Sequence, residues 1–417
     1  MDEKNRIYQF ENGLVLLYEE MNWSESFAIG ISVPCGVIWE PSELAGLAAM
    51  TCEMTNRGAG EYDNRSFLEE FENIGVRSSE VAAKIYSHFG ARGLCDNWER
   101  TLELLALQVC KPQLIEDELA VCKQICIQEI TAENDNPDNK TNRAFYDIFL
   151  PNPLGRRTIG TVESIEKMTV DDLRRYHQAV YRPNGTVIGV AGRVPWEKLR
   201  DKVDQLFGDW NVKDARRAQL EENKQSTVHI PSNNAQAIIK LGYRDISSRT
   251  PDYLRSLGGI KVLSGGMSSR LFTEVREKRG LCYSVDASHY SIEDIGYVVC
   301  SCGTTVERAQ ESLDVILAEI ERLGTDPISQ SELERVKIRL KSSLIMQRES
   351  ASRRVGAIIG DWLDFRKIQQ LDELSGKIES LTCEAIESYY AENSDTRKFR
   401  LATLGPRPLV IPKDKLF

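Results

Sequence analysis

Histidine is the commonest ligand of protein-bound transition metals, so the four histidines of the chain are the first candidates for chemistry. They are His88, His177, His229 and His289, and no two of them are close in sequence. The chain therefore contains no H-E-x-x-H or H-x-x-E-H motif, and a helical zinc site of that kind cannot form. We expect each histidine to be a surface residue or a hydrogen-bonded core residue.

Two other common catalytic motifs are also missing. The glycine-rich segment SGGMSS at 264–269 lacks the lysine with which a P-loop reaches phosphate, so a nucleotide site is not expected. No G-x-S-x-G elbow occurs, which argues against a serine hydrolase of that type.

The ten cysteines lack the close paired spacings of a metal or redox site. Cys122 and Cys126 lie one helical turn apart, a spacing that could bind a metal, but they share a helix face with Leu119 and Ile130. We therefore interpret both as core residues. Cys300 and Cys302 would point to one side of a strand and are interpreted in the same way.

Composition limits the classes of partner. The 417 residues are 41% hydrophobic and 28% charged, which is typical of a folded globular protein with two or three domains. A formal net charge of -10 argues against a surface for nucleic acid or acidic membranes. No apolar run is long enough to span a membrane, and the first residues lack the apolar core of a signal peptide, so a cytoplasmic location is predicted.

Hydrophobic periodicity predicts a mixture of strands and helices that must position any site. Near the start we expect strands at 6–10, 14–18 and 27–33, and a helix from Ser42, its predicted N-cap, to Gly58. Further predicted helices include 64–74, 98–109, 116–132, 142–149, 169–180 and 196–207, with strands within 76–93 and at 186–190. The predicted fold class is α+β.

An internal repeat divides the chain into two halves. Ile165, Thr169, Leu173, Tyr176 and Gly192 have counterparts at one constant offset in Ile378, Thr382, Ile386, Tyr389 and Gly405. Both segments predict a helix followed by an apolar strand that ends at glycine. A polar stretch at 211–226 is interpreted as the interdomain linker, so the predicted domains are 1–210 and 227–417, each of about 200 residues.

The most specific motif is GGMSSRLFTEVREKRGLCYSV at 265–285. It closely resembles the C-terminal-half signature of the pitrilysin-like zinc peptidases, which include mitochondrial processing peptidase and the insulin-degrading enzymes. Shorter matches at NGL (12–14), NPLGR (152–156), GTVESI (160–165) and YRPNG (181–185) extend the resemblance over nearly the whole chain. The resemblance implies two homologous α+β domains, each an antiparallel-rich sheet packed with helices, in a clamshell.

The zinc motif of that family is degenerate here. The matching stretch GLAAMTCEM at 46–54 puts Ala49, Cys52 and Glu53 where active members have His, Glu and His, and only Glu129 matches the distal glutamate ligand. Ala49 cannot ligate and Cys52 cannot replace the carboxylate base, so no catalytic zinc is expected in this chain. The alternative is a remnant zinc site that uses Cys52, Glu53, Glu129 and His88.

The second-half signature is intact. An arginine and a tyrosine seven residues apart, matching Arg276 and Tyr283, reach the active site in active members. The resemblance implies that they hold the substrate and assist the tetrahedral transition state. Without it, Arg276 would be an ordinary surface arginine and Tyr283 a half-buried strand residue.

The resemblance therefore implies a non-catalytic subunit of a heterodimeric zinc metallopeptidase. Its partner would be a homologous subunit that carries the zinc motif and the zinc, while this chain would bind peptide substrate and supply Arg276 and Tyr283. The alternative is a catalytically inactive homodimer that binds peptides or serves as a scaffold. Neither alternative includes nucleic acid or a membrane.

Overall fold

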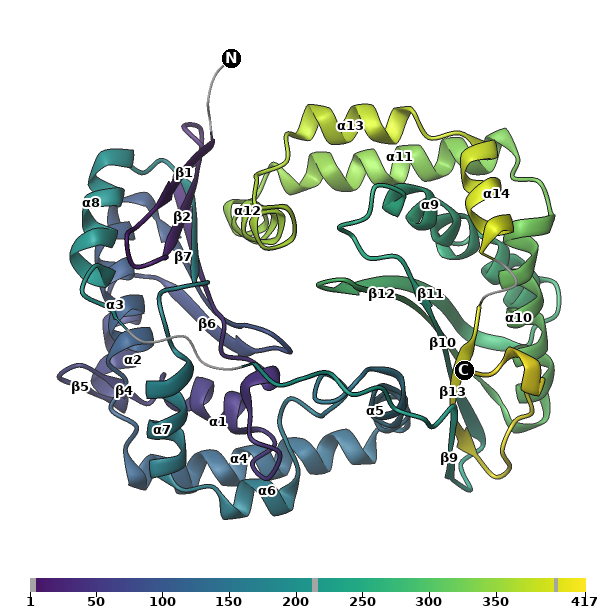
Figure 1. Ribbon diagram of the computed structural model, residues 1–417, viewed down its shortest axis with the longest axis horizontal. Coiled ribbons are helices and arrows are strands. Elements are labelled where there is room, and N and C mark those ends of the chain that lie inside the picture. Colours follow the sequence, from purple (N-terminus) through teal and green to yellow (C-terminus); the bar gives the residue numbers. More distant parts are fainter. Residues whose placement is uncertain (1–4, 212–216, 394–396) are drawn as a thin grey trace. The chain divides into compact units, whose positions relative to one another are not determined.

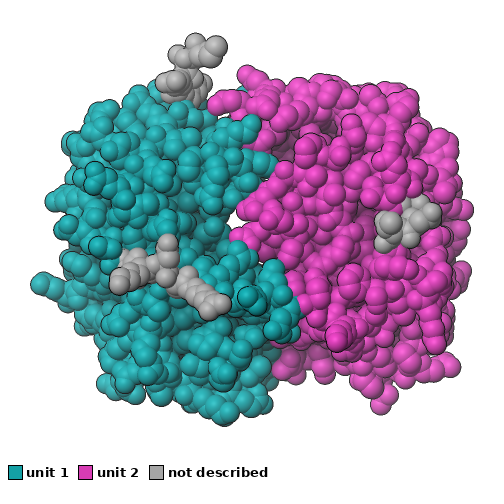
Figure 2. All heavy atoms as spheres, in the orientation of Figure 1, with its two compact units in different colours: residues 1–132, 152–221, 346–368 teal, residues 133–151, 222–345, 369–417 magenta. Residues whose placement is uncertain are grey.

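The computed structural model of the protein describes residues 5–211, 217–393 and 397–417 (Figure 1). The chain divides into two compact units (Figure 2). Unit 1 comprises residues 1–132, 152–221 and 346–368, and unit 2 comprises residues 133–151, 222–345 and 369–417. Each unit therefore contains one segment from the opposite half of the sequence.

Unit 1 is built on a six-stranded sheet. Its strand order is β1(Asn5–Gln9), β2(Val15–Glu20), β8(Val187–Gly192), β3(Ser26–Val33), β7(Ser87–Leu94) and β6(Arg77–Ala82). Only β2 and β8 pair in parallel, and all other neighbours are antiparallel. Strand β6 is thus the edge strand at one side.

One face of this sheet packs on helices of the same half of the sequence. These are α1(Leu47–Met54), α2(Asn64–Asn73), α3(Trp98–Cys110), most of α4(Glu116–Asp135), α6(Val162–Lys167), α7(Val170–Val180) and α8(Trp196–Phe207). A short hairpin of β4(Gly58–Ala59) and β5(Tyr62–Asp63) follows α1. Alternate strand residues such as Ile29, Ile31 and Phe89 join the helices in one buried cluster.

The opposite face is covered in part by α12(Ala351–Phe365), which comes from the second half of the sequence. Glycine makes this approach possible, because an added Cβ on Gly30 would lie 2.7 Å from Val355 and one on Gly189 would lie 2.7 Å from Ile359. The buried guanidinium of Arg354 donates to both oxygens of Glu19 at 2.8 and 2.9 Å. Together these contacts fix α12 to unit 1.

Unit 2 repeats the plan. Its five strands run in the order β11(Cys282–Ile292), β12(Ile295–Thr305), β10(Gln236–Asp245), β13(Phe399–Gly405) and β9(Thr227–Pro231), and only β13 and β9 are parallel. This order and this pairing pattern match β6, β7, β3, β8 and β2 of unit 1. Strand β11 is therefore the edge strand that corresponds to β6.

The helices of unit 2 are arranged in the same way. They are α9(Tyr253–Ser264), α10(Ala309–Thr325), most of α11(Gln330–Gln347), α13(Leu371–Glu379) and α14(Cys383–Glu392). The opposite sheet face packs on α5(Pro137–Phe149), which comes from the first half of the sequence. There the buried side chain of Arg400 donates to the carbonyl oxygens of Ile148 and Phe149 at 2.6 and 2.8 Å.

The predicted α+β fold with two similarly built domains is confirmed. Thr169 and Thr382, matched in the sequence repeat, are the N-caps of α7 and α14, and Gly192 and Gly405 end β8 and β13. Part of the predicted linker, 212–216, lies outside the described residues, and the boundary at 211–226 stays a prediction. No helix among the described residues is long and apolar enough to cross a lipid bilayer.

Candidate functional site

The helix that carries the degenerate zinc motif begins later than the sequence predicts. Helix α1 starts at Leu47 after Gly46, whose φ of 93° suits glycine, whereas the predicted N-cap Ser42 lies outside it. The free amides at the helix start are satisfied by the buried Glu40 carboxylate, which accepts from the Gly46 and Ala48 amides at 3.1 and 2.8 Å. The cap thus comes from a residue upstream of the turn rather than from the residue next to the helix.

Cys52 and Ala49 do not form a metal site. Cys52 is buried with a relative exposure of 2% in the core of unit 1. Burial raises the pKa of its thiol well above the usual range, so the thiol stays protonated and is a poor ligand for a metal. Ala49 has no donor atom.

Glu53 is committed to an ion pair that sequence reasoning missed. Its carboxylate lies 2.7 Å from the guanidinium of Arg57, one helical turn later, and the same guanidinium lies 4.0 Å from Glu118. Burial alone would lower the pKa of Arg57, but the hydrogen bond to Glu53 and the surrounding charges raise it. A guanidinium therefore holds the positive charge beside Glu53. The i, i+4 spacing of Glu53 and Arg57 was the available signal.

A second carboxylate faces this region from the sheet. Glu80 on β6 accepts a hydrogen bond of 3.3 Å from the amide of Asn56. Burial, and then the nearby charge of Glu53, raise the pKa of Glu80 to about 7. Below about pH 7 Glu80 is therefore mostly protonated, whereas a carboxylate that binds a metal must be deprotonated.

The remaining predicted positions do not complete a metal site. Glu129 is exposed on α4. His88 pairs with Ser32 on β3, and its Nδ1 lies 2.8 Å from the Ser32 hydroxyl. Because strand residues alternate in direction, His88 lies on the sheet face opposite to that of Phe89 and the α1 side. Within 5–211, 217–393 and 397–417, no three His, Cys, Asp or Glu side chains are grouped to hold a metal ion. The residues present do not fit the zinc ion of the family pattern.

The structure brings the other predicted pair into contact. Arg276 lies on the π-helix Phe272–Glu277 and Tyr283 near the start of β11, with a register irregularity between Cys282 and Ser284. The guanidinium carbon of Arg276 lies 5.2 Å from the ring centre of Tyr283 and 4.7 Å from that of Phe272, so it is stacked between two rings. π-Helices are rare and are frequent at functional sites.

The polar atoms of this pair are available for a ligand. Tyr283 is 81% exposed, and in the described part of the chain neither its hydroxyl nor the Arg276 guanidinium has a hydrogen-bond or ion-pair partner. Next to them, a hydrogen bond with Cys302 and the charge of Arg276 lower the pKa of the Cys282 thiol, against the effect of burial. The pair thus offers one phenol donor on an edge strand and one guanidinium fork on the adjacent π-helix.

The segment that precedes the pair is held in place by contacts of Arg270 and Gly266. Arg270 forms an ion pair of 2.9 Å with Glu332 on α11 and also donates to the Pro327 carbonyl at 2.9 Å. Gly266, with a φ of 140°, precedes it in a conformation that favours glycine, and its Cα lies against the guanidinium of Arg339. Glycine and arginine of the GGMSSR motif therefore serve to fix the turn.

Comparison with known proteins places both halves of the chain. Residues 15–162 match the family described as insulinase (peptidase family M16), and residues 167–340 match the family described as peptidase M16 inactive domain. An uncharacterized zinc protease of Bacillus subtilis (strain 168), YmxG, is 28% identical over 402 residues, which cover 96% of this chain and 98% of that protein.

Solved structures share the fold. A structure described as peptidase M16 inactive domain from Pseudomonas fluorescens superposes with a TM-score of 0.89 at 23% identity, over 98% of this chain and 99% of that chain. A chain of complex III2 from Candida albicans superposes with a TM-score of 0.82 at 18% identity, over 96% of each chain.

Proposed function

Because the chain belongs to the M16 (insulinase) family of peptidases, we propose that it is a non-catalytic subunit that binds peptide and supplies Arg276 and Tyr283 to the zinc site of a homologous partner. The observation that carries the proposal is a contrast between two sites. Arg276 and Tyr283 lie in contact with their polar atoms unpartnered, whereas Cys52 is a buried neutral thiol and Glu53 is paired with Arg57.

The chemistry of the pair suits peptide hydrolysis in a partner's site. The Tyr283 hydroxyl can donate a hydrogen bond to the oxyanion that develops when a peptide carbonyl becomes tetrahedral. The Arg276 guanidinium offers two parallel donors to a peptide carbonyl or a carboxylate. Stacking between Phe272 and Tyr283 holds that fork without using its N–H groups. The partner's zinc would supply the activated water.

Peptide binding is supported by the sheet edges. Strands β6 and β11 are each last in their sheet, so one side of each has backbone donors and acceptors without a strand partner in the described residues. An extended peptide can add to such an edge through main-chain hydrogen bonds. Tyr283 lies on one of these strands, within reach of a peptide added there.

The test is reconstitution with a homologue from the same source that contains H-x-x-E-H. We expect a heterodimer that cleaves a fluorogenic peptide. Tyr283→Phe should lower kcat about tenfold or more, the scale of a lost oxyanion donor, and change KM little. Arg276→Ala should lower kcat/KM by a similar factor.

Matched controls come from the same segment. Tyr290→Phe removes a hydroxyl from the same strand, and Arg279→Ala removes a charge that is paired with Glu274. Both should leave turnover within about twofold. Unchanged turnover in Tyr283→Phe and Arg276→Ala would refute the assigned roles. Failure to pair with, or to activate, any such homologue would favour the inactive homodimer that binds peptides or serves as a scaffold.

A further inference from the structure

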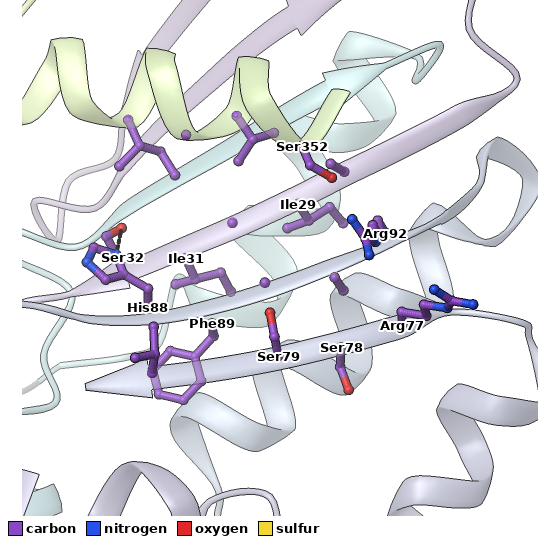
Figure 3. Close-up of a pocket in the computed structure, with 18 of the residues that line it drawn as sticks. Ile29, Ile31, Ser32, Arg77, Ser78, Ser79, His88, Phe89, Arg92 and Ser352 are labelled. Carbon is purple, nitrogen blue, oxygen red and sulfur yellow. Dashed lines mark hydrogen bonds between the residues drawn. The ribbon is translucent and has the colours of Figure 1, made fainter. Parts of the chain in front are cut away.

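A cavity of about 520 Å³ lies entirely within unit 1, between the sheet and α12 (Figure 3). Its floor is the part of the sheet formed by β3, β7 and β6, and its wall is one side of α12. Twenty residues line it, and none of them is an aspartate or a glutamate. The cavity is therefore a space with two charged side chains of one sign, Arg77 and Arg92.

The cavity is open because α12 covers only part of the sheet face. Val355 and Ile359 lie directly over Gly30 and Gly189, above β3 and β8. On the side toward β7 and β6, α12 presents Ser352, Gly356 and Gly360, and a Cβ added to either glycine would meet nothing within 4 Å. Small residues at this spacing leave the adjoining sheet face uncovered.

Arg77 and Arg92 are direct cross-strand neighbours. They are Cα partners in the β6–β7 register, so both side chains point to the same face, which is the face that lines the cavity. Both are exposed, and neither has a hydrogen bond or an ion pair in the part of the chain that the structure describes. Like charges directly opposite each other destabilise a sheet, so a ligand group of opposite sign would relieve this repulsion.

The other side chains in this row indicate what kind of ligand would fit beside the two arginines. From Arg77 and Arg92, the same row continues to Ser79 opposite Gly90, and then to Val81 opposite His88. Val81 is an exposed apolar side chain at 58%. Along β6 the row thus changes from the cationic Arg77 through Ser79 to the apolar Val81 over four residues of strand, roughly 13 Å.

An extended peptide added to the open edge of β6 would place every second side chain on this face. We propose that Arg77 and Arg92 form a carboxylate-binding subsite that selects peptide segments with an aspartate or glutamate four residues from an apolar side chain. Two guanidinium groups side by side suit the two oxygens of one carboxylate. The inference rests on the proposed peptide binding and adds the charge class of the peptide.

The test measures peptide binding to the full chain without a partner, by fluorescence anisotropy. The probes are labelled nine-residue peptides, acetylated and amidated so that the only charge is one central glutamate, with a valine four residues away in either order. We expect the glutamate peptides to bind about tenfold more tightly than glutamine versions. Arg77→Gln and Arg92→Gln should each remove most of that preference without changing the binding of the glutamine peptide.

Controls separate this subsite from general charge effects and from folding. Arg65→Gln removes an exposed charge on α2 that is paired with Glu69, and it should keep the preference. Arg77→Glu should raise Tm, since glutamate opposite Arg92 replaces a repulsive pair with an attractive one. Because the new pair has no net charge, the variant should also lose the preference for glutamate peptides.

The outcomes are distinct. Equal binding of glutamate and glutamine peptides by the wild-type chain would overturn the subsite and leave the proposed peptide-binding function standing. Absence of peptide binding would overturn both. A preserved charge preference with no activation of a zinc-bearing homologue would overturn the partner role alone.

Discussion

At the scale of single residues, Glu80 is placed so that its ionisation costs stability. It is partly buried and lies near the charge of Glu53, and these effects raise its pKa to about 7 from an ordinary value near 4.5. A carboxyl group whose folded pKa is raised contributes stability below the unfolded pKa, and that contribution is lost as pH rises through the folded pKa. The free energy of unfolding should therefore fall between about pH 4.5 and 7.

The Glu80→Gln variant should not show this part of the pH dependence. We expect the wild type to lose up to about 3 kcal/mol relative to the variant between pH 4.5 and 8, measured by urea denaturation at several pH values. Glu40, whose pKa burial raises to about 8, is present in both proteins and cancels in the difference. Parallel curves for the two proteins would contradict the burial of a neutral Glu80.

Several residues of the candidate site could be named from the sequence and others could not. The motif around Arg276 and Tyr283 identified a pair seven residues apart, and the structure brings them into contact. The role of Arg57 was not predicted, although its i, i+4 spacing to Glu53 was visible, because charged pairs at that spacing are usually surface features. The predicted start of α1 was wrong because the cap is Glu40, which lies upstream of the turn and not next to the helix.

At the scale of elements, the sequence predicts most of the long helices and apolar strands. It does not indicate that α5 and α12 each pack on the sheet formed by the other half of the sequence. Nothing local to α5 or α12 tells which sheet each one covers, since that depends on a nonlocal fit. For α12 the fit requires Gly30 and Gly189 below Val355 and Ile359. Its Gly356 and Gly360 also weaken the helical signal in the sequence, since glycine is a poor helix former.

The fit of α12 predicts unequal effects at two neighbouring glycines. Gly30 and Gly90 are Cα partners on adjacent strands, but only Gly30 lies beneath α12. Gly30→Ala would put its Cβ 2.7 Å from Val355 and should cost about 1–3 kcal/mol of unfolding free energy. The closest atom to an added Cβ in Gly90→Ala would be the Ser79 hydroxyl at 3.3 Å, so this substitution should cost less than about 1 kcal/mol. Equal losses in urea denaturation would show that α12 does not press on Gly30.

At the scale of the whole molecule, the two halves of the sequence are repeats, yet each half completes the other's core. The sequence repeat predicted two domains in series. In the structure, α5 from the first half packs on the sheet of unit 2, and α12 from the second half packs on the sheet of unit 1. A duplicated unit that has exchanged one helix can no longer bury both faces of its sheet alone.

Separate expression of 1–210 and 217–417 should reveal this dependence. The first fragment lacks α12, which exposes an apolar face with Val15, Leu17 and Val187, and the second lacks α5 over β10 and β13. We expect each fragment alone to bind the dye ANS and to aggregate, because an exposed apolar sheet face of this kind promotes association.

Co-expression should restore a complex of one copy of each, in which Arg354 again reaches Glu19 and Arg400 reaches the end of α5. Arg354→Met in the second fragment should weaken the complex, since Glu19 would be left with an unpaired charge. Two fragments that are each monomeric, cooperative in unfolding and free of dye binding would show that the exchanged helices are dispensable.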